Sequence, residues 1–344
     1  MRTPLRVGVV GLSARGLRLA KIFDDLPQTE LRWLCDKRPE LRAVNHTRNP
    51  GTRIAADPAE LFADESLDIV VVATPAESHY ELVGGAIDAN KHVFVNEPLA
   101  RTGDEADDLV DRAARIDRRI VVAHRVLFHP GVTKVKELIE TGQLGEIYYL
   151  GSSRLEYAAH DVFMGPFADA IAVLMHLIGD QPIEIAARTE SYIRPDGADV
   201  VLGFLKFATG ITAHAQVSRL DPRGLAQVTA VGSKGAVAFD DTGSNAEVTV
   251  YENAARVLRA AADEDLAVLG DVVRPRLPRD DPELVACERL LTSVHSPALA
   301  ADNVREAAAI VHAFNAAARS ADYRGRPEGV TGAPTQATVV ELHM

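Results

Sequence analysis

The stretch Leu5-Arg-Val-Gly8-Val-Val-Gly11-Leu-Ser13-Ala14-Arg15-Gly16 joins an apolar strand to the start of a helix. At such a turn, backbone N–H groups and the N-terminus of the helix can face a pyrophosphate. Gly11 permits the tight turn, and Gly16 permits close packing of the helix against the strand. The usual middle glycine is Ser13 here, so the turn alone is also compatible with a strand, turn and helix that bind no nucleotide.

An acidic residue strengthens the prediction of a nucleotide site. Asp36 ends the second apolar run, 30–35, at the spacing where an acid holds the hydroxyls of an adenosine ribose. Lys37 and Arg38 follow and could instead neutralise a 2′-phosphate, so NAD and NADP both remain possible cofactors. The predicted cofactor residues of this region are Gly11, Ser13, Ala14, Arg15, Asp36, Lys37 and Arg38.

Apolar runs alternate with helical patterns through the first part of the chain. The runs are nearly continuous, as expected of parallel strands that are covered on both faces. This alternation predicts a doubly wound α/β sheet, a Rossmann domain, over residues 1–124. The predicted strands are 5–10, 30–35, 68–73, 92–95 and 120–123, with helices over 16–25, 58–63, 78–89 and 103–116.

After residue 125 the pattern of apolar residues shifts towards a period of two. We predict a second domain over 125–344, an open and mostly antiparallel α+β sheet with helices on one face, whose last helix can pack back on the first domain. A second subunit is the simplest cover for the open face, which predicts a homodimer or homotetramer. Residues 252–279 are predicted to form a long loop. The predicted strands are 147–157, 183–193, 199–207, 211–217, 227–231, 236–239 and 247–251, and the helices are 132–141, 166–178, 282–294 and 303–321.

Composition narrows the class of protein. The net charge is −12, from 49 acidic and 37 basic residues, which disfavours a nucleic-acid partner because such binding needs a basic footprint. The two cysteines, Cys35 and Cys287, provide neither a disulfide framework nor zinc-ligand spacing, so we predict a reduced, cytoplasmic protein without a metal. The sequence shows no signal peptide and no apolar run of about 18 residues, so no membrane partner is expected.

Several motifs resemble the Gfo/Idh/MocA oxidoreductases, the glucose–fructose oxidoreductase and inositol dehydrogenase type. They span nearly the whole chain, and the resemblance is greatest to members that act on nucleotide sugars or on sugars of secondary metabolism. It implies that Thr74, Pro75, His79, Asn96 and Glu97 belong to the NAD(P) site. The motifs are Ala73-Thr74-Pro75 with Ser78-His79, Lys91 to Ala100, Phe128-His129-Pro130, Gly142 to Tyr148 and Val231 to Gly235.

The residues that carry hydride chemistry in that family are replaced here. The resemblance implies a Glu-Lys-Pro motif whose lysine touches the nicotinamide ribose and the substrate, but this chain has Asn96-Glu97-Pro98. It also implies an aspartate and a histidine on a later helix, at positions occupied by Gly165 and Asp169. Oxidising an alcohol needs a base within hydrogen-bond reach and gains from a nearby cation. Glu97 and Asp169 could act as bases, but neither supplies a cation.

Other polar residues lie where ligands of a doubly wound sheet are expected, at or beyond the carboxyl edge of its strands. His160 is a candidate proton carrier by residue type, which makes it a third catalytic candidate beside Glu97 and Asp169. The alternative interpretation is that none of the three is catalytic. His160 would then be an ordinary loop histidine, and Glu97 and Asp169 would be solvated carboxylates. The candidate substrate ligands are Arg125, His129, Arg154 and Tyr157, and His124, Glu156, Asp161 and His176 lie in the same regions.

Two functions follow from these observations. The first is an NAD(P)-dependent oxidoreductase on a sugar, nucleotide sugar or related secondary-metabolite intermediate. The second is a repurposed relative that performs a non-redox step, such as cyclisation, elimination or epimerisation, or that binds another enzyme without catalysis. The match along the whole chain favours the first function, and the replacements at Glu97, Gly165 and Asp169 favour the second.

Overall fold

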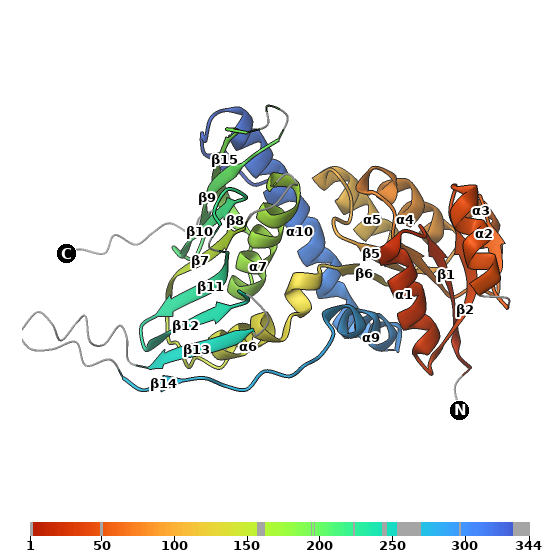
Figure 1. The fold of residues 1–344 in the computed structure, drawn as a ribbon, viewed down its shortest axis with the longest axis horizontal. Helices are drawn as coiled ribbons and strands as arrows, with labels where there is room; N and C mark the ends of the chain where they lie inside the picture. Colours follow the sequence, from red (N-terminus) through yellow and green to blue (C-terminus); the bar gives the residue numbers. More distant parts are fainter. Residues whose placement is uncertain are drawn as a thin grey trace, which may run out of the picture. The chain divides into compact units, whose positions relative to one another are not determined.

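Six parallel strands form the first sheet, in the order β3-β2-β1-β4-β5-β6 (Figure 1). This is the strand order of a dinucleotide-binding doubly wound sheet, so the predicted Rossmann fold is confirmed. The short strand β3 and the polar helix α2 (Pro39–Arg48) were not predicted. The strands are β1 (Leu5–Val10), β2 (Thr29–Cys35), β3 (Arg53–Ala55), β4 (Ile69–Val72), β5 (His92–Asn96) and β6 (Ile120–Ala123).

Alternate residues of these strands bury against helices on opposite faces of the sheet. On one face Phe23 of α1 (Ala14–Asp25) makes an edge contact with Phe94 of β5, with ring centroids 5.6 Å apart. On the other face Val70 and Val72 join a buried cluster with residues from α4 and α5. Covering both faces explains why these strands carry continuous apolar runs. The remaining elements here are α3 (Pro58–Phe62), η1 (Ala76–Ser78), α4 (His79–Asp88) and α5 (Gly103–Arg115).

Nine strands form the second sheet, in the order β14-β13-β12-β11-β7-β10-β9-β8-β15. Every neighbouring pair is antiparallel except β7 and β10, which confirms the predicted mostly antiparallel sheet. Val272–Val273 forms the short strand β14, inside the segment predicted as a loop. The strands are β7 (Ile147–Leu155), β8 (Pro182–Glu190), β9 (Val200–Phe207), β10 (Thr212–Ser218), β11 (Leu225–Gly232), β12 (Gly235–Asp240), β13 (Glu247–Glu252), β14 and β15 (Glu328–Gly329).

Helices cover one face of this second sheet. α6 (Pro130–Glu140) contacts β12 and β13, and α7 (Ala168–Ile178) contacts β7 and β10. The predicted helix 166–178 is in fact two elements, because a π-helical turn, η3 (Phe163–Phe167), with Pro166 inside it precedes α7. Three large apolar side chains of this sheet are exposed: Tyr149 on β7, and Leu202 and Phe204 on β9.

The chain divides into two compact units, Met1–Arg125 with Asp281–Val311, and Val126–Asp280 with His312–Met344. Helix α9 (Pro282–His295) and the first half of α10 (Pro297–Asp322) therefore group with the Rossmann sheet. The sequence-based division placed all residues after 124 in the second domain, with a last helix that can pack back on the first. The computed structural model describes residues 3–48, 51–156, 162–193, 195, 197–222, 224–242, 246–252, 270–295 and 297–332.

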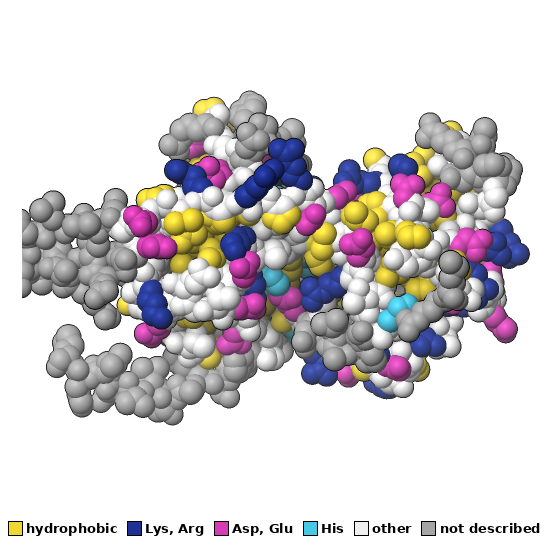
Figure 2. All heavy atoms as spheres, turned by 90° about the horizontal axis from the view of Figure 1, so that it is seen from below, with side chains coloured by type: hydrophobic (Ala, Val, Ile, Leu, Met, Phe, Trp, Pro, Cys, Tyr) yellow, Lys and Arg dark blue, Asp and Glu magenta, His cyan; other side chains and the backbone are white. Residues whose placement is uncertain are grey.

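Surface charge is mixed in the described part of the chain. Figure 2 shows basic and acidic side chains interspersed over the face that it presents, without a broad field of one sign. None of the helices in the described ranges is long and apolar enough to cross a membrane. Burial raises the pKa of the Cys35 thiol to about 12 and also raises that of Cys287, so both cysteines are buried thiols with little nucleophilic character.

Candidate functional site: a dinucleotide pocket in the Rossmann unit

The turn after β1 is built by two glycines that no other residue can replace. Gly11 has a φ of +98°, and a Cβ atom there would lie 2.5 Å from the carbonyl oxygen of Ala73. A Cβ atom on Gly16 would lie 1.8 Å from the carbonyl oxygen of Gly11. Ser13 occupies the N-cap of α1 but its side chain makes no capping hydrogen bond, so the first N–H groups of the helix have no side-chain cap. This turn suits an anion.

Asp36 lies at the carboxyl end of β2 and is only 5% exposed. Its carboxylate accepts hydrogen bonds from the backbone N–H of Leu12 at 2.8 Å and from the guanidinium of Arg38 at 2.8 and 2.9 Å. Burial raises the pKa of Asp36, but the hydrogen bonds from Arg38 and Leu12 outweigh it and lower the pKa to about 2. The acid is therefore ionised at neutral pH and fixed beside the turn.

A cavity of about 650 Å³ extends from Asp36 along the turn to the end of β5. That volume is in the range of small-molecule and cofactor sites. Two of the predicted cofactor residues, Ala14 and His79, are absent from its lining. The predicted residues that line it are Gly11, Ser13, Arg15, Asp36, Lys37, Arg38, Thr74, Pro75, Asn96 and Glu97.

His79 is a structural clamp within this unit. It is 1% exposed, and its ring nitrogens lie 2.7 Å from the carbonyl oxygen of Pro98 and 2.8 Å from that of Thr74. The histidine thereby ties the loop after β4 to the loop after β5. Both loops contribute lining residues to the cavity, so His79 shapes the site from behind rather than facing it.

Replacing His79 with alanine is expected to destabilise the Rossmann unit by about 2–4 kcal/mol, because a buried carbonyl group loses its donor and a cavity remains. The measurement is thermal unfolding followed by circular dichroism. Ser78→Ala is the matched control, since Ser78 is partly exposed and its hydroxyl bonds only Thr74 and Pro75 nearby. Equal melting temperatures for the two variants would contradict the clamp.

The carboxylate of Glu97 is not free. Arg15, on the first turn of α1, donates to it from Nη1 at 3.0 Å and from Nη2 at 3.0 and 2.9 Å. Both carboxylate oxygens are engaged by this guanidinium fork, so a substrate hydroxyl would have to compete with Arg15 for them. The prediction of Glu97 as a base therefore loses support, and the pair with Arg15 is a feature that the sequence did not reveal.

One buried polar group on the cavity wall indicates whether a dinucleotide fits. Asn96 is 6% exposed, and its Oδ1 atom has no hydrogen-bond partner among the residues that the structure describes. A buried acceptor of this kind requires a donor, which a ribose hydroxyl or a carboxamide of the cofactor can supply. The residues of the cavity therefore fit a dinucleotide.

The second unit holds its own group of candidate residues. Arg154 and Asp169 line a small cavity of about 60 Å³ together with Asp241. Asp169 lies in the first turn of α7, directly after the π-helical turn η3. A Cβ atom on Gly165 would meet nothing within 4 Å, so an aspartate would fit in its place. Among the described residues, no group of three or more His, Cys, Asp and Glu side chains could hold a metal ion.

The other sequence candidates have varied environments. His129 is the N-cap of α6: its Nδ1 accepts from the backbone N–H of Gly131 at 3.1 Å, and its ring packs on Phe239. Its Nε2 lies 3.8 Å from Oδ1 of Asp241, so the ring caps α6 and packs on Phe239 while this nitrogen lies beside an acidic side chain. Arg125 begins η2 (Arg125–Phe128) and is exposed. Tyr157, His160 and Asp161 lie outside the described residues.

Comparison with known proteins agrees with this geometry. Residues 5–124 match the family model described as an oxidoreductase family with an NAD-binding Rossmann fold, and residues 132–238 match the GFO/IDH/MocA C-terminal domain. The chain belongs to the GFO/IDH/MocA oxidoreductase family. As a member of it, the chain carries an NAD-binding Rossmann domain, and the cavity beside Gly11 and Asp36 lies within that domain.

Individual relatives of this family member are distant. A glycosyl hydrolase family 109 protein of Shewanella sp. (strain MR-4) is 30% identical over 154 residues, which are 42% of this chain and 34% of the relative, so the match spans about a third of that protein. UDP-N-acetylglucosamine 3-dehydrogenase from Acidithiobacillus ferrooxidans has the same fold, with a TM-score of 0.80 at 17% identity over 94% of this chain and 99% of that one. A levoglucosan dehydrogenase, in complex with NADH and L-sorbose, gives a TM-score of 0.77 at 19% identity over 96% and 99%.

Proposed function

We propose that this protein is an NAD-dependent oxidoreductase that acts on a sugar, a nucleotide sugar or a related secondary-metabolite intermediate. The observation that carries the proposal is the 650 Å³ cavity, which has an ionised Asp36 at one end and the unsatisfied Asn96 Oδ1 at the other. The sugar class is supported by the dehydrogenases of the same fold, one of which acts on a nucleotide sugar and one of which binds L-sorbose.

The contacts of Asp36 favour NAD over NADP. A 2′-phosphate would lie against a carboxylate that carries a full negative charge at neutral pH, because its pKa is about 2. The nearest cation, Arg38, is already held by that carboxylate through two of its nitrogens. The ribose hydroxyls of NAD, by contrast, can donate to the same oxygens in place of Arg38.

Titration of nicotinamide fluorescence is expected to show NADH binding at least about tenfold more tightly than NADPH. Asp36→Asn should weaken NADH binding by about 10–100-fold, because a hydrogen bond to a charged group is lost, and should leave NADPH binding unchanged or improved. Glu60→Gln removes one exposed acid of α3 outside the cavity and serves as the control for charge. Tighter binding of NADPH than of NADH would reverse the cofactor assignment, and binding of neither would remove the proposed function.

The bound cofactor would supply the hydride acceptor, and the chain must supply the group that takes the hydroxyl proton. Glu97 is occupied by Arg15, so we propose Asp169 for this role, with His160 as the alternative from the sequence. Arg154 shares a cavity with Asp169 and is proposed as a ligand for an anionic or hydroxyl-rich group of the substrate. Tyr157, Arg125 and His129 stay predictions as further substrate ligands.

A non-redox reaction is the second candidate, and one relative favours it. The family 109 protein is by name a glycosyl hydrolase, and hydrolysis has no net redox change. The two reactions differ in their use of cofactor. A dehydrogenase consumes one NAD for each product formed and absorbance at 340 nm rises in proportion, whereas a non-redox enzyme forms product without a lasting rise. Incubation of the protein with NAD and a panel of sugars and glycosides separates the two.

Assembly and compartment stay predictions. We propose a homodimer or homotetramer through the open face of the second sheet, and the exposed Tyr149, Leu202 and Phe204 support an apolar cover there. The cytoplasmic location proposed from the sequence is supported by two buried cysteines that remain free thiols.

A further inference from the structure

The cation that the Asn96-Glu97-Pro98 loop lacks is present on another element. Arg15 of α1 reaches this loop, and its guanidinium is bound by Glu97 through three hydrogen bonds of 2.9–3.0 Å. Both side chains line the cavity, with 36% of Arg15 and 23% of Glu97 exposed. The sequence alone shows an acid where the resemblance implies a lysine, but the structure shows that acid paired with an arginine.

Strand order places this pair at the nicotinamide end of the cavity. A dinucleotide binds across the carboxyl edge of a doubly wound sheet at the point where the strand order reverses, here between β1 and β4. Asp36 follows β2 and marks the adenosine half. Glu97 follows β5, on the other side of the reversal, beside the unsatisfied Asn96. Arg15 lies between them on the first turn of the helix that faces the diphosphate.

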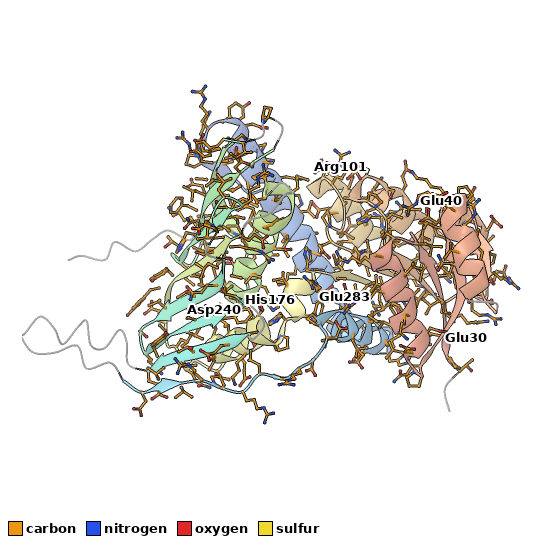
Figure 3. All side chains as sticks on the ribbon, viewed as in Figure 1. Glu30, Glu40, Arg101, His176, Asp240 and Glu283 are labelled. Carbon is orange, nitrogen blue, oxygen red and sulfur yellow. The ribbon has the colours of Figure 1, made fainter. Side chains whose placement is uncertain are left out.

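A second carboxylate supports the position of Arg15. Glu283 lies at the start of α9 (Figure 3). It is 6% exposed, and its Oε1 atom lies 3.8 Å from Nε of Arg15. Glu283 also forms an ion pair with Arg18, one turn further along α1, and Arg18 pairs with Asp281 at 2.8 Å. Because Glu283 is shared with Arg18, it steadies Arg15 without cancelling its charge by itself.

We propose that Arg15 supplies the positive charge for the diphosphate and nicotinamide ribose of the cofactor, and that Glu97 is a positioning residue that holds the guanidinium fork. In this chain the positive charge is therefore on Arg15, in the turn after β1, and not on a lysine at position 97 in the loop after β5. Arginine suits this role because its planar fork can bind a carboxylate on one edge and present further donors to phosphate or hydroxyl oxygens. This inference rests on the proposed binding of NAD and assigns residues within that site.

Calorimetric titration with NADH and with adenosine tests the inference on the intact protein. Adenosine has no phosphate and occupies only the adenosine half, so Arg15→Ala should weaken NADH binding by at least about tenfold while adenosine affinity stays within about twofold. Glu97→Ala should weaken NADH binding by a smaller factor, and the double variant should bind no worse than Arg15→Ala alone, since Glu97 acts through Arg15. Lys21→Ala removes an exposed cation from the same helix and should leave both affinities unchanged.

Different results overturn different statements. Tighter NADH binding by Glu97→Ala would show that the carboxylate competes with the cofactor for Arg15, and equal losses of adenosine and NADH affinity in Arg15→Ala would show a merely structural role. Either result removes this inference while NAD binding stands. A wild-type protein that binds adenosine but not NADH would instead remove the proposed function, and this inference with it.

Glu97→Lys gives a further test, because it restores the lysine that the family resemblance implies. We expect this single change to lower both the melting temperature and NADH affinity, since it places an ammonium group beside Arg15. The double variant, Glu97→Lys with Arg15→Ala, should recover at least about half of the decrease in melting temperature that Glu97→Lys alone causes. It should also bind NADH more tightly than either single variant. A Glu97→Lys protein that binds NADH more tightly than wild type would contradict the proposed role of Arg15.

Discussion

Replacing Gly16 with alanine is expected to abolish NADH binding, raising Kd by more than about 100-fold. The added Cβ atom would lie 1.8 Å from the carbonyl oxygen of Gly11, a backbone atom that cannot rotate away. Relieving this overlap requires α1 to move from the turn, which separates the N–H groups that would face the diphosphate. The overpacking should also cost about 1–3 kcal/mol of stability.

Two measurements check this expectation: NADH titration by fluorescence and thermal unfolding by circular dichroism. Gly51→Ala is the control, because a Cβ atom there would meet nothing within 4 Å and its backbone does not require glycine. We expect that variant to bind NADH as wild type does. A Gly16→Ala protein with unchanged NADH affinity would show that the diphosphate does not lie on this turn.

Replacing Asp199 with alanine is expected to lower the melting temperature by on the order of 10 °C. Asp199 has no exposed surface, and its Oδ1 atom accepts from Nε of Arg219 at 2.5 Å. Its Oδ2 atom accepts from the backbone N–H groups of Tyr192 and Ile193 at 2.5 and 2.6 Å. Removing the carboxylate takes a charged partner from the buried Arg219 and the acceptor from the backbone N–H groups of Tyr192 and Ile193.

The exposed pair of Arg188 and Glu190, at 2.8 Å on β8, supplies the control for this prediction. Arg188→Ala should change the melting temperature little, because exposed ion pairs contribute little to stability. An Asp199→Ala protein that melts as high as the Arg188→Ala protein would refute a structural role for the buried pair.

The same carboxylate sets a direction for the dependence of stability on pH. The backbone N–H of Ile193 lowers the pKa of Asp199, burial opposes it, and Arg219 and Tyr192 lower it further. A carboxyl whose pKa is lowered in the folded state stabilises the fold above the pKa of the unfolded chain, about 3.9, and that contribution is lost as the pH falls. The difference in melting temperature between wild type and Asp199→Ala should therefore shrink below about pH 4.

Much of the fold could be predicted because its signals are local. The glycines of the first turn, the acid after the second strand and the continuous apolar runs each depend on neighbours within a few tens of residues. β3 and α2 were missed because one is only three residues long and the other is mostly polar. The π-helical turn before α7 was missed because Pro166 is equally compatible with an ordinary helix start.

The site was predicted less completely because its key contacts join distant parts of the chain. From the sequence, Glu97 places a negative charge where the family resemblance implies a lysine. Its partner Arg15 lies 82 residues earlier in the chain. The arginine was visible in the sequence as a cofactor residue, but nothing local showed which way its side chain points. His79 resembled a cofactor ligand by motif, whereas its two carbonyl partners make it a clamp between loops.

A crystal structure of the protein with bound NAD would show where each half of the cofactor lies. We predict that the adenosine ribose hydroxyls lie within hydrogen-bond distance of Asp36, that the diphosphate lies over the Gly11–Gly16 turn, and that the guanidinium of Arg15 contacts the diphosphate or the nicotinamide ribose. A dinucleotide that lies elsewhere, or one whose nicotinamide half lies beside Asp36, would contradict this account.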